Sequence, residues 1–215
     1  MNRKPLALSL LCVLALAGST GVACADELSD DIATLAHGWA KANYQTPDAQ
    51  KETAFTQLES RAHQVSLHFA GHAEPLVWEG IIASSLAKYQ SMFAAGKSAT
   101  QARDLLLAAQ KIDANVLDGS AYVSLGVLYY KVPGWPLSFG DRKKAAELLQ
   151  RGLQIDPHGI DANYFYGEFL SQHGDPKQAT VYLNRALAAP PRPGREDADA
   201  GRHAEIEALL KTLNS

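Results

Sequence analysis

The chain has 215 residues, and its 20 lysine and arginine residues against 23 aspartate and glutamate residues give a formal net charge of −3. Without a basic excess, neither nucleic acid nor an anionic membrane surface is expected as a partner. Beyond the first 25 residues, no apolar run reaches the roughly 18 residues that a membrane-spanning helix needs.

The first 25 residues have the pattern of a secretory signal peptide. A short basic region precedes an almost wholly apolar run over residues 5–17, and small residues at 23–25 form a cleavage site. We therefore expect a periplasmic protein whose mature chain begins at Asp26. The alternative is a lipid anchor at Cys24, because a degenerate lipobox ends there. Both cysteines lie in this leader, so the mature chain has no thiol chemistry.

Residues 26–72 are expected to form an N-terminal helical pair. Apolar residues recur at helical spacing from residue 28 to 44 and again from 49 to 69, where Gly71 ends the second helix. The pair is about the size of the later units, but it lacks the glycine and alanine that mark them. We interpret it as a degenerate repeat or an N-terminal cap.

Residues 73–117 are expected to form an elongated helical repeat. Pro75 lies in the first turn of a helix predicted to continue through Met92. Gly96 is predicted to end this helix, and Ser98 or Thr100 to cap its partner.

Two further repeats are predicted at residues 118–158 and 159–192. The second helix of each begins after a Gly-Asp pair and ends at a proline, and the aspartate is expected to cap the helix. The matching positions are 34 residues apart: Gly140, Asp141, Ala145, Leu149, Arg151, Leu153 and Pro157 recur as Gly174, Asp175, Ala179, Leu183, Arg185, Leu187 and Pro191.

Residues 131–139 are an insertion between the two helices of the third unit. Its two prolines and its glycine exclude a continued helix, and Trp135 and Phe139 are unusual in a spacer. Two alternatives remain open. The loop is either a plug over an apolar edge or a lip that shapes a pocket, because an exposed tryptophan would be costly otherwise.

Residues 193–215 are expected to form a linker and a capping helix. The final helix, from Asp197 to Leu213, has one apolar face, as a terminal cap requires. Arg192, Arg195 and Arg202 are expected to be solvated or to form weak surface pairs with nearby acids.

The 34-residue spacing resembles that of the tetratricopeptide repeat (TPR) family. This resemblance implies an all-α, right-handed α-solenoid of antiparallel helix pairs that binds a protein or peptide partner, here in the cell envelope. A weaker similarity, to helical repeat proteins associated with TRAP-type transporters, implies instead an accessory role with a small apolar ligand. The residues at concave-groove positions are Tyr130, Lys131, Tyr164, Glu168 and Gln172, with Trp135 beside them.

No enzymatic, metal or cofactor site is expected. His68 and His72 are four residues apart, but Gly71 and Pro75 interrupt the helix that would present both rings. Ser138, Asp141 and His158 could be imagined as catalytic partners. The sequence has no nucleophile elbow or phosphate loop around them, and Asp141 is explained as a helix cap.

Overall fold

The structure is a computed structural model that describes residues 19–214. The apolar part of the predicted signal peptide lies outside the described residues. Within them the chain is helical, and its one β-type contact is an isolated bridge between Gly134 and Gly140. The elements are α1 (Ser19–Ala40), η1 (Lys41–Gln45), α2 (Asp48–His68), α3 (Ala73–Leu86), η2 (Ala87–Tyr89), α4 (Met92–Ile112), α5 (Val116–Lys131), α6 (Arg142–Ile155), α7 (Ile160–His173), α8 (Pro176–Leu187) and α9 (Glu196–Leu213).

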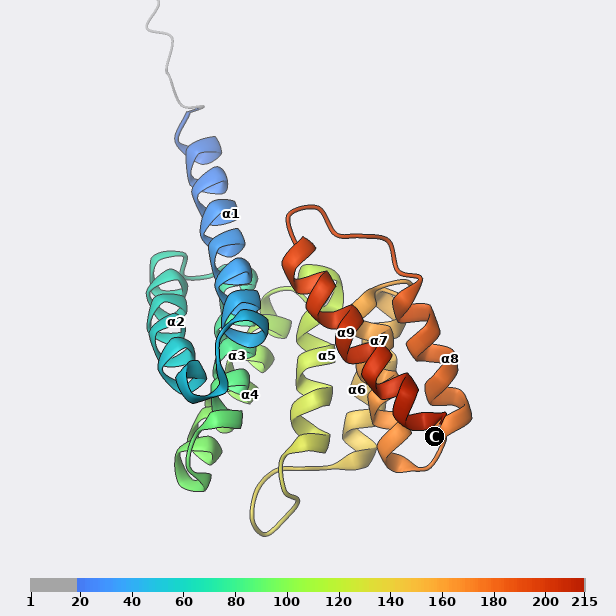
Figure 1. The fold of residues 1–215 in the computed structure, drawn as a ribbon. Helices are drawn as coiled ribbons and strands as arrows, with labels where there is room; N and C mark the ends of the chain where they lie inside the picture. The colour runs from blue at the N-terminus through green and yellow to red at the C-terminus, as the bar shows by residue number, and fades with distance from the viewer. Residues whose placement is uncertain (1–18, 215) are drawn as a thin grey trace, which may run out of the picture.

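The helices form four antiparallel pairs in a row, which is the predicted all-α solenoid. Figure 1 shows the pairs in order, from α1 and α2 at one end to α7 and α8 at the other. Four apolar clusters connect them, and each cluster draws on at least three successive helices, so that each pair shares its core with the next. Stacking therefore buries apolar surface that a single helix pair would leave exposed to water.

One close contact recurs inside all four pairs: a glycine of the first helix faces a leucine of the second. A Cβ atom on Gly126 would lie 2.6 Å from Leu149, so the two helices approach too closely there for any larger residue. The N-terminal pair has the same contact, although it lacks the Gly-Asp pair that precedes the second helix of the later units. The four contacts are Gly38 with Leu58, Gly80 with Leu106, Gly126 with Leu149, and Gly167 with Leu183.

The second pair differs from its prediction at one boundary. Helix α3 ends at Leu86, η2 follows, and α4 already begins at Met92 and continues through Gly96. Tyr89 stacks on Phe55 of α2, with ring centroids 5.7 Å apart, and this contact fixes the turn. The glycine that was predicted to end a helix is an interior residue of α4, at a cost of about 1 kcal/mol relative to alanine.

Helix α9 does more than cap the last pair. Ile206 is fully buried in the cluster with α7 and α8, as a cap requires. The same helix also contacts α1 and η1, at the other end of the row. In Figure 1 it crosses in front of α5 and α7. The solenoid is thus closed across its concave side.

Within residues 19–214, no helix has both the length and the apolar character needed to cross a bilayer. The predicted cleavage point before Asp26 falls inside α1. Among the residues whose side chains are described, residues 25–27 are exposed and the first buried one is Leu28.

Candidate functional site

A cavity of about 2000 Å³ occupies the concave side of the solenoid. The first helices of the pairs, α1, α3, α5 and α7, form its wall, and α9 closes it. The second helices α2, α6 and α8 contribute none of its lining residues, whereas the N-terminal half of α4 contributes to the rim. Small-molecule sites usually measure about 300–1,000 Å³, so this cavity has room for more than one compact ligand.

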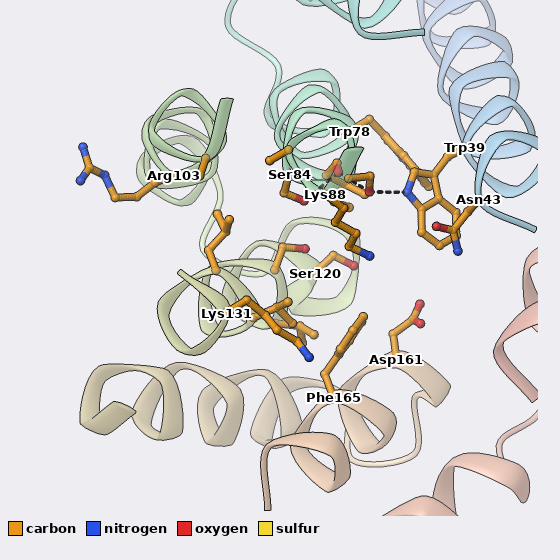
Figure 2. Close-up of a pocket in the computed structure, with 18 of the residues that line it drawn as sticks. Trp39, Asn43, Trp78, Ser84, Lys88, Arg103, Ser120, Lys131, Asp161 and Phe165 are labelled. Atoms are coloured by element: carbon orange, nitrogen blue, oxygen red, sulfur yellow. Dashed lines mark hydrogen bonds between the residues drawn. The ribbon is translucent and has the colours of Figure 1, made fainter. Parts of the chain in front are cut away.

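Aromatic rings form much of the inner surface of the cavity. Trp39 and Trp78 are largely buried and reach it with an edge. The indole Nε1 of Trp39 donates a hydrogen bond to Ser85 Oγ at 2.9 Å, which joins α1 to α3 (Figure 2). Phe165 projects from α7 on the opposite side. The wall is therefore mainly apolar, with polar groups at defined points.

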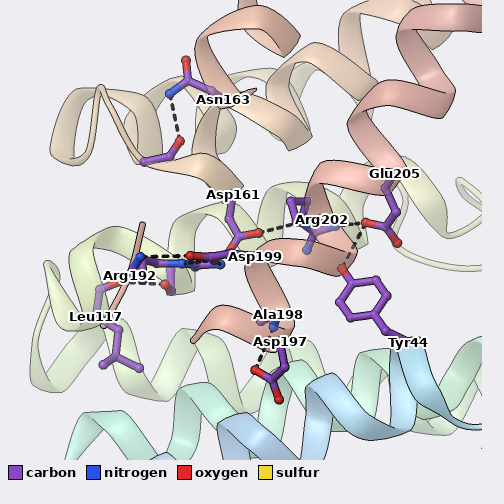
Figure 3. Close-up of polar contacts among 12 residues, drawn as sticks. Tyr44, Leu117, Asp161, Asn163, Arg192, Asp197, Ala198, Asp199, Arg202 and Glu205 are labelled. Carbon is purple, nitrogen blue, oxygen red and sulfur yellow. Dashed lines mark hydrogen bonds and ion pairs between the residues drawn. The ribbon is translucent and has the colours of Figure 1, made fainter. Parts of the chain in front are cut away.

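Asp161, at the start of α7, is the centre of an ion-pair network (Figure 3). Its carboxylate accepts hydrogen bonds from Arg192 at 2.6 Å and from Arg202 at 2.8 Å. Arg192 also pairs with Asp199 at 2.6 Å, and Arg202 with Glu205. The network ties the linker and α9 to α7.

The neighbouring arginines lower the pKa of the Asp161 carboxyl group. Burial alone would raise the pKa of its carboxyl group, but the charges of Arg202 and Arg192 outweigh burial and hold the pKa well below its usual range. Arg202 is only 5% exposed, and its guanidinium also lies 4.5 Å from the ring centre of Tyr164. The expectation of solvated arginines was therefore wrong for Arg202, because it also pairs with Asp161, which lies 41 residues away in the sequence.

Two contacts extend this network to the N-terminal pair. The hydroxyl of Tyr44 donates to Glu205 at 3.2 Å, and His37 Nδ1 lies 3.3 Å from Asp197 Oδ2. Gly201 of α9 packs directly on the Tyr44 ring, where a Cβ atom would lie 2.3 Å away. These contacts fasten α9 across the cavity.

A second paired group lies on α5 and α7. Glu168 accepts a hydrogen bond from the Tyr130 hydroxyl and one from Lys131 Nζ at 2.7 Å. Burial raises the pKa of Tyr130, and the adjacent Glu168 carboxylate adds to this effect. Three of the residues predicted for the groove therefore contact each other.

Lys88, in η2, is the exception to this pairing. Its side chain points into the space between Trp39 and Asn43 on one side and Phe165 on the other (Figure 2). Among the described residues it has no hydrogen bond or ion pair. The Lys88 residue stays exposed to the open cavity, but partial burial of its ammonium group lowers the pKa of that group, and the positive charge of Arg202 lowers it further.

Four exposed apolar side chains surround the mouth of the cavity. Met92 and Phe93 begin α4, and Trp135 and Leu137 lie in the 131–139 loop; their exposed fractions are 93%, 76%, 89% and 83%. The base of the loop is fixed, because Gly140 N donates to Pro133 O at 2.9 Å. This geometry supports the lip interpretation of Trp135 over the plug.

The predicted groove residues do not all line the cavity. Lys131, Trp135, Tyr164 and Glu168 do, whereas Tyr130 lies behind Glu168 and Gln172 is exposed outside it. A binding role for these residues stays a prediction. Sequence reasoning did not single out Lys88, since no local sequence pattern distinguishes a lysine that faces the cavity from an ordinary surface lysine.

The residues weighed for catalysis and metal binding have other contacts. The Asp141 side chain accepts from the backbone of Lys143 at 2.9 Å and Lys144 at 3.0 Å, which confirms it as the cap of α6. Asp175 caps α8 in the same way. His68 lies 3.5 Å from Glu27, and the described residues contain no cluster of three potential metal ligands.

Comparison with known proteins adds sequence evidence for one part of the chain. Residues 137–195 match the family model described as "Tetratricopeptide repeat". Protein adenylyltransferase Fic of Nematostella vectensis is 41% identical over 63 residues, which make up 29% of this chain. The match spans only 14% of the length of that relative.

Solved structures resemble the chain over most of its length. A thermophilic TPR protein of Thermus thermophilus superposes with a TM-score of 0.56 at 13% identity, over 89% of this chain and 95% of that one. MamA from Desulfovibrio magneticus RS-1 gives a TM-score of 0.44 at 14% identity, over 86% and 98% of the two chains. The first of these comparisons shows a shared fold.

Proposed function

Because the chain has the tetratricopeptide repeat fold and its residues 137–195 match that family, we propose that it is a non-catalytic scaffold that binds a protein or peptide partner in the bacterial periplasm or cell envelope. The observation that carries this proposal is the apolar mouth of the cavity, formed by Met92, Phe93, Trp135 and Leu137. Exposed apolar clusters of this kind mark interaction sites, since leaving them in water is unfavourable.

The rigid base of the 131–139 loop supports a binding role. Phe139 packs on Tyr129, with ring centroids 5.3 Å apart, and lies under the guanidinium of Arg103 at 4.7 Å. Gly140 allows the two ends of the loop to touch, because a Cβ atom there would lie 2.2 Å from Val132 O. A lip held in one position costs less entropy when a partner binds.

Site-specific photo-crosslinking tests the proposed partner site. A photo-reactive residue at position 135 should give one dominant adduct in cells, whereas the same residue at position 67 should not. Leu67 is the control because it is an exposed apolar residue, 61% exposed, that does not line the cavity. Equal labelling from both positions, or none from 135, would reject the proposal.

Export is a separate part of the proposal and has its own test. Cleavage before Asp26 would leave the buried residues of α1 intact, since the first of them described is Leu28. Intact-mass analysis of the exported protein should give a chain beginning at Asp26, or at an acylated Cys24 if the lipid anchor is used. An uncleaved chain that begins at Met1 would contradict export.

A second candidate is the accessory role in solute uptake by a TRAP-type transporter. The enclosure of the cavity by α9 favours it, because an open groove would suit an extended partner better. Uptake assays in a strain lacking this protein would separate the two candidates. A specific transport defect favours this role, and normal transport favours the scaffold.

A further inference from the structure

Lys88 has no acidic partner because the nearest acids already have cationic ones. The charged groups that act on it are Arg202 and Lys131, which repel it, and Glu205 and Glu168, which attract it. Glu205 accepts hydrogen bonds from Arg202 and Tyr44. Glu168 accepts hydrogen bonds from Lys131 and Tyr130. These contacts largely compensate the negative charges of Glu205 and Glu168, so the two carboxylates attract Lys88 only weakly.

The same cavity contains a second cation without an acidic partner. Arg195 precedes α9 and lies over the ring of Trp78, with its guanidinium carbon 5.0 Å from the ring centre. Its Nε atom is buried and has no hydrogen-bond acceptor. A cation that is removed from water without a partner is costly, and an anion that enters the cavity relieves this cost.

Further polar and apolar groups complete the surroundings of Lys88. The side chain of Asn43 faces the same space (Figure 2), and no hydrogen bond to another described side chain occupies its carboxamide. Trp39 and Phe165 add apolar surface on opposite sides. The surroundings of Lys88 thus combine its positive charge, which has no ion-pair partner among the described residues, with an amide donor and a mainly apolar enclosure.

We propose that the cavity binds a small amphipathic carboxylate, with its carboxylate at Lys88 and its apolar body against Trp39, Trp78 and Phe165. This goes beyond the proposed partner binding at the mouth and does not depend on it. A single carboxylate suits the site better than a multiply charged group, because Glu168 and Glu205 are already paired and Lys88 offers one positive charge.

Enclosure favours a small molecule over a peptide at this inner position. Helix α9 is fastened to η1 by Tyr44 and Glu205 and to α1 by His37 and Asp197. These contacts hold α9 over the cavity, and a small ligand needs less room than a folded partner to reach Lys88. A bound peptide is therefore an alternative result of the test.

The test compares decanoate with decanol, which has the same chain without the charge. Isothermal titration calorimetry on the full mature protein should show decanoate binding at least ten-fold more tightly than decanol. Lys88→Met should weaken decanoate binding at least ten-fold and leave decanol binding unchanged. Lys177→Met is the control, because it removes a lysine from α8, which does not line the cavity, and it should change neither affinity.

Several results would overturn the proposal: no decanoate binding, equal affinity for the two ligands, or an unchanged affinity in Lys88→Met. If instead an acidic peptide binds in a Lys88-dependent way and decanoate does not, the site belongs to the partner. A thermal melt confirms that the variant is folded, and Lys88→Gln repeats the test with a neutral polar side chain. Photo-crosslinking from position 135 should persist in Lys88→Met, so the two proposals can fail separately.

Discussion

Charged side chains form ion pairs on one side of the cavity, whereas Lys88 on the other side forms none with the described residues. On the side formed by α7 and α9, Asp161 and Glu168 each accept from a cation, and Arg202 is almost completely buried between carboxylates. On the α3 side, Lys88 enters the same cavity with no such partner among the described residues. Paired groups fasten helices together, whereas an unpaired group is available to a ligand. The comparison therefore separates structural charges from a binding charge.

Of the variants proposed, Asp161→Asn should lower the stability of the protein most, because it removes ion pairs on the side of the cavity formed by α7 and α9. The substitution removes one of the two carboxylates that Arg192 and Arg202 each contact, and two lost charge-assisted hydrogen bonds of about 1.5 kcal/mol each lower the unfolding free energy by about 3 kcal/mol. Urea denaturation measures the loss. Asp104→Asn is the control, because Asp104 forms an exposed pair with Arg103 and should cost less than about 1 kcal/mol. Equal losses in the two variants would contradict a structural role for the network.

Acid should weaken the ion pairs that Asp161 forms with the two arginines, and it should do so over a defined pH range. The pKa of Asp161 is lower in the folded than in the unfolded chain, so its contribution is fully present above the unfolded value, 3.8, and is lost as the pH falls through the folded value. Urea midpoints measured from pH 5 downward should fall more steeply in the natural protein than in Asp161→Asn. Parallel curves would show that Asp161 is not the titrating group.

Glu168→Gln should leave Lys131 without its carboxylate partner. Lys131 and Tyr130 lose a charged acceptor, at a cost of about 1.5 kcal/mol, so the loss should be smaller than that for Asp161→Asn. The cavity also gains net positive charge, and decanoate should bind several-fold more tightly in calorimetry. Weaker binding would show that Glu168 helps to hold the ligand.

Lys88→Met should have the smallest effect on stability. Lys88 is exposed and has no ion pair among the described residues, so its replacement should change the unfolding free energy by less than about 0.5 kcal/mol. Thermal and urea unfolding measure the difference. A loss of more than about 1 kcal/mol would mean that Lys88 has a structural partner.

The repeated part of the fold could be predicted from the sequence. Helix caps at Asp141 and Asp175 and the spacing of small residues are local signals, and the structure confirms them. The first helical pair was predicted from the spacing of its apolar residues alone. Its contact between Gly38 and Leu58 was not predicted, because no 34-residue offset relates this pair to the later ones.

The cavity could be predicted only in part. Lys131 and Glu168 were expected at groove positions of the repeat, and both line the cavity, whereas their role in binding stays a prediction. Lys88 and Arg202 belong to the cavity because α9 returns to η1, and that contact joins residues about 160 positions apart. Sequence periodicity describes neighbouring helices and contains no information about this closure.

The pKa of Lys88, measured by NMR on ¹³C-labelled lysine side chains, tests the central claim most directly. Lys51 is the internal reference, because its hydrogen bond to Asp48 raises its pKa above the ordinary value of 10.5. Lys88 should titrate below 10.5, and added decanoate should move its pKa upward while that of Lys51 stays fixed. If Lys88 titrates together with Lys51 and does not respond to decanoate, it is not an unpaired charge inside the cavity.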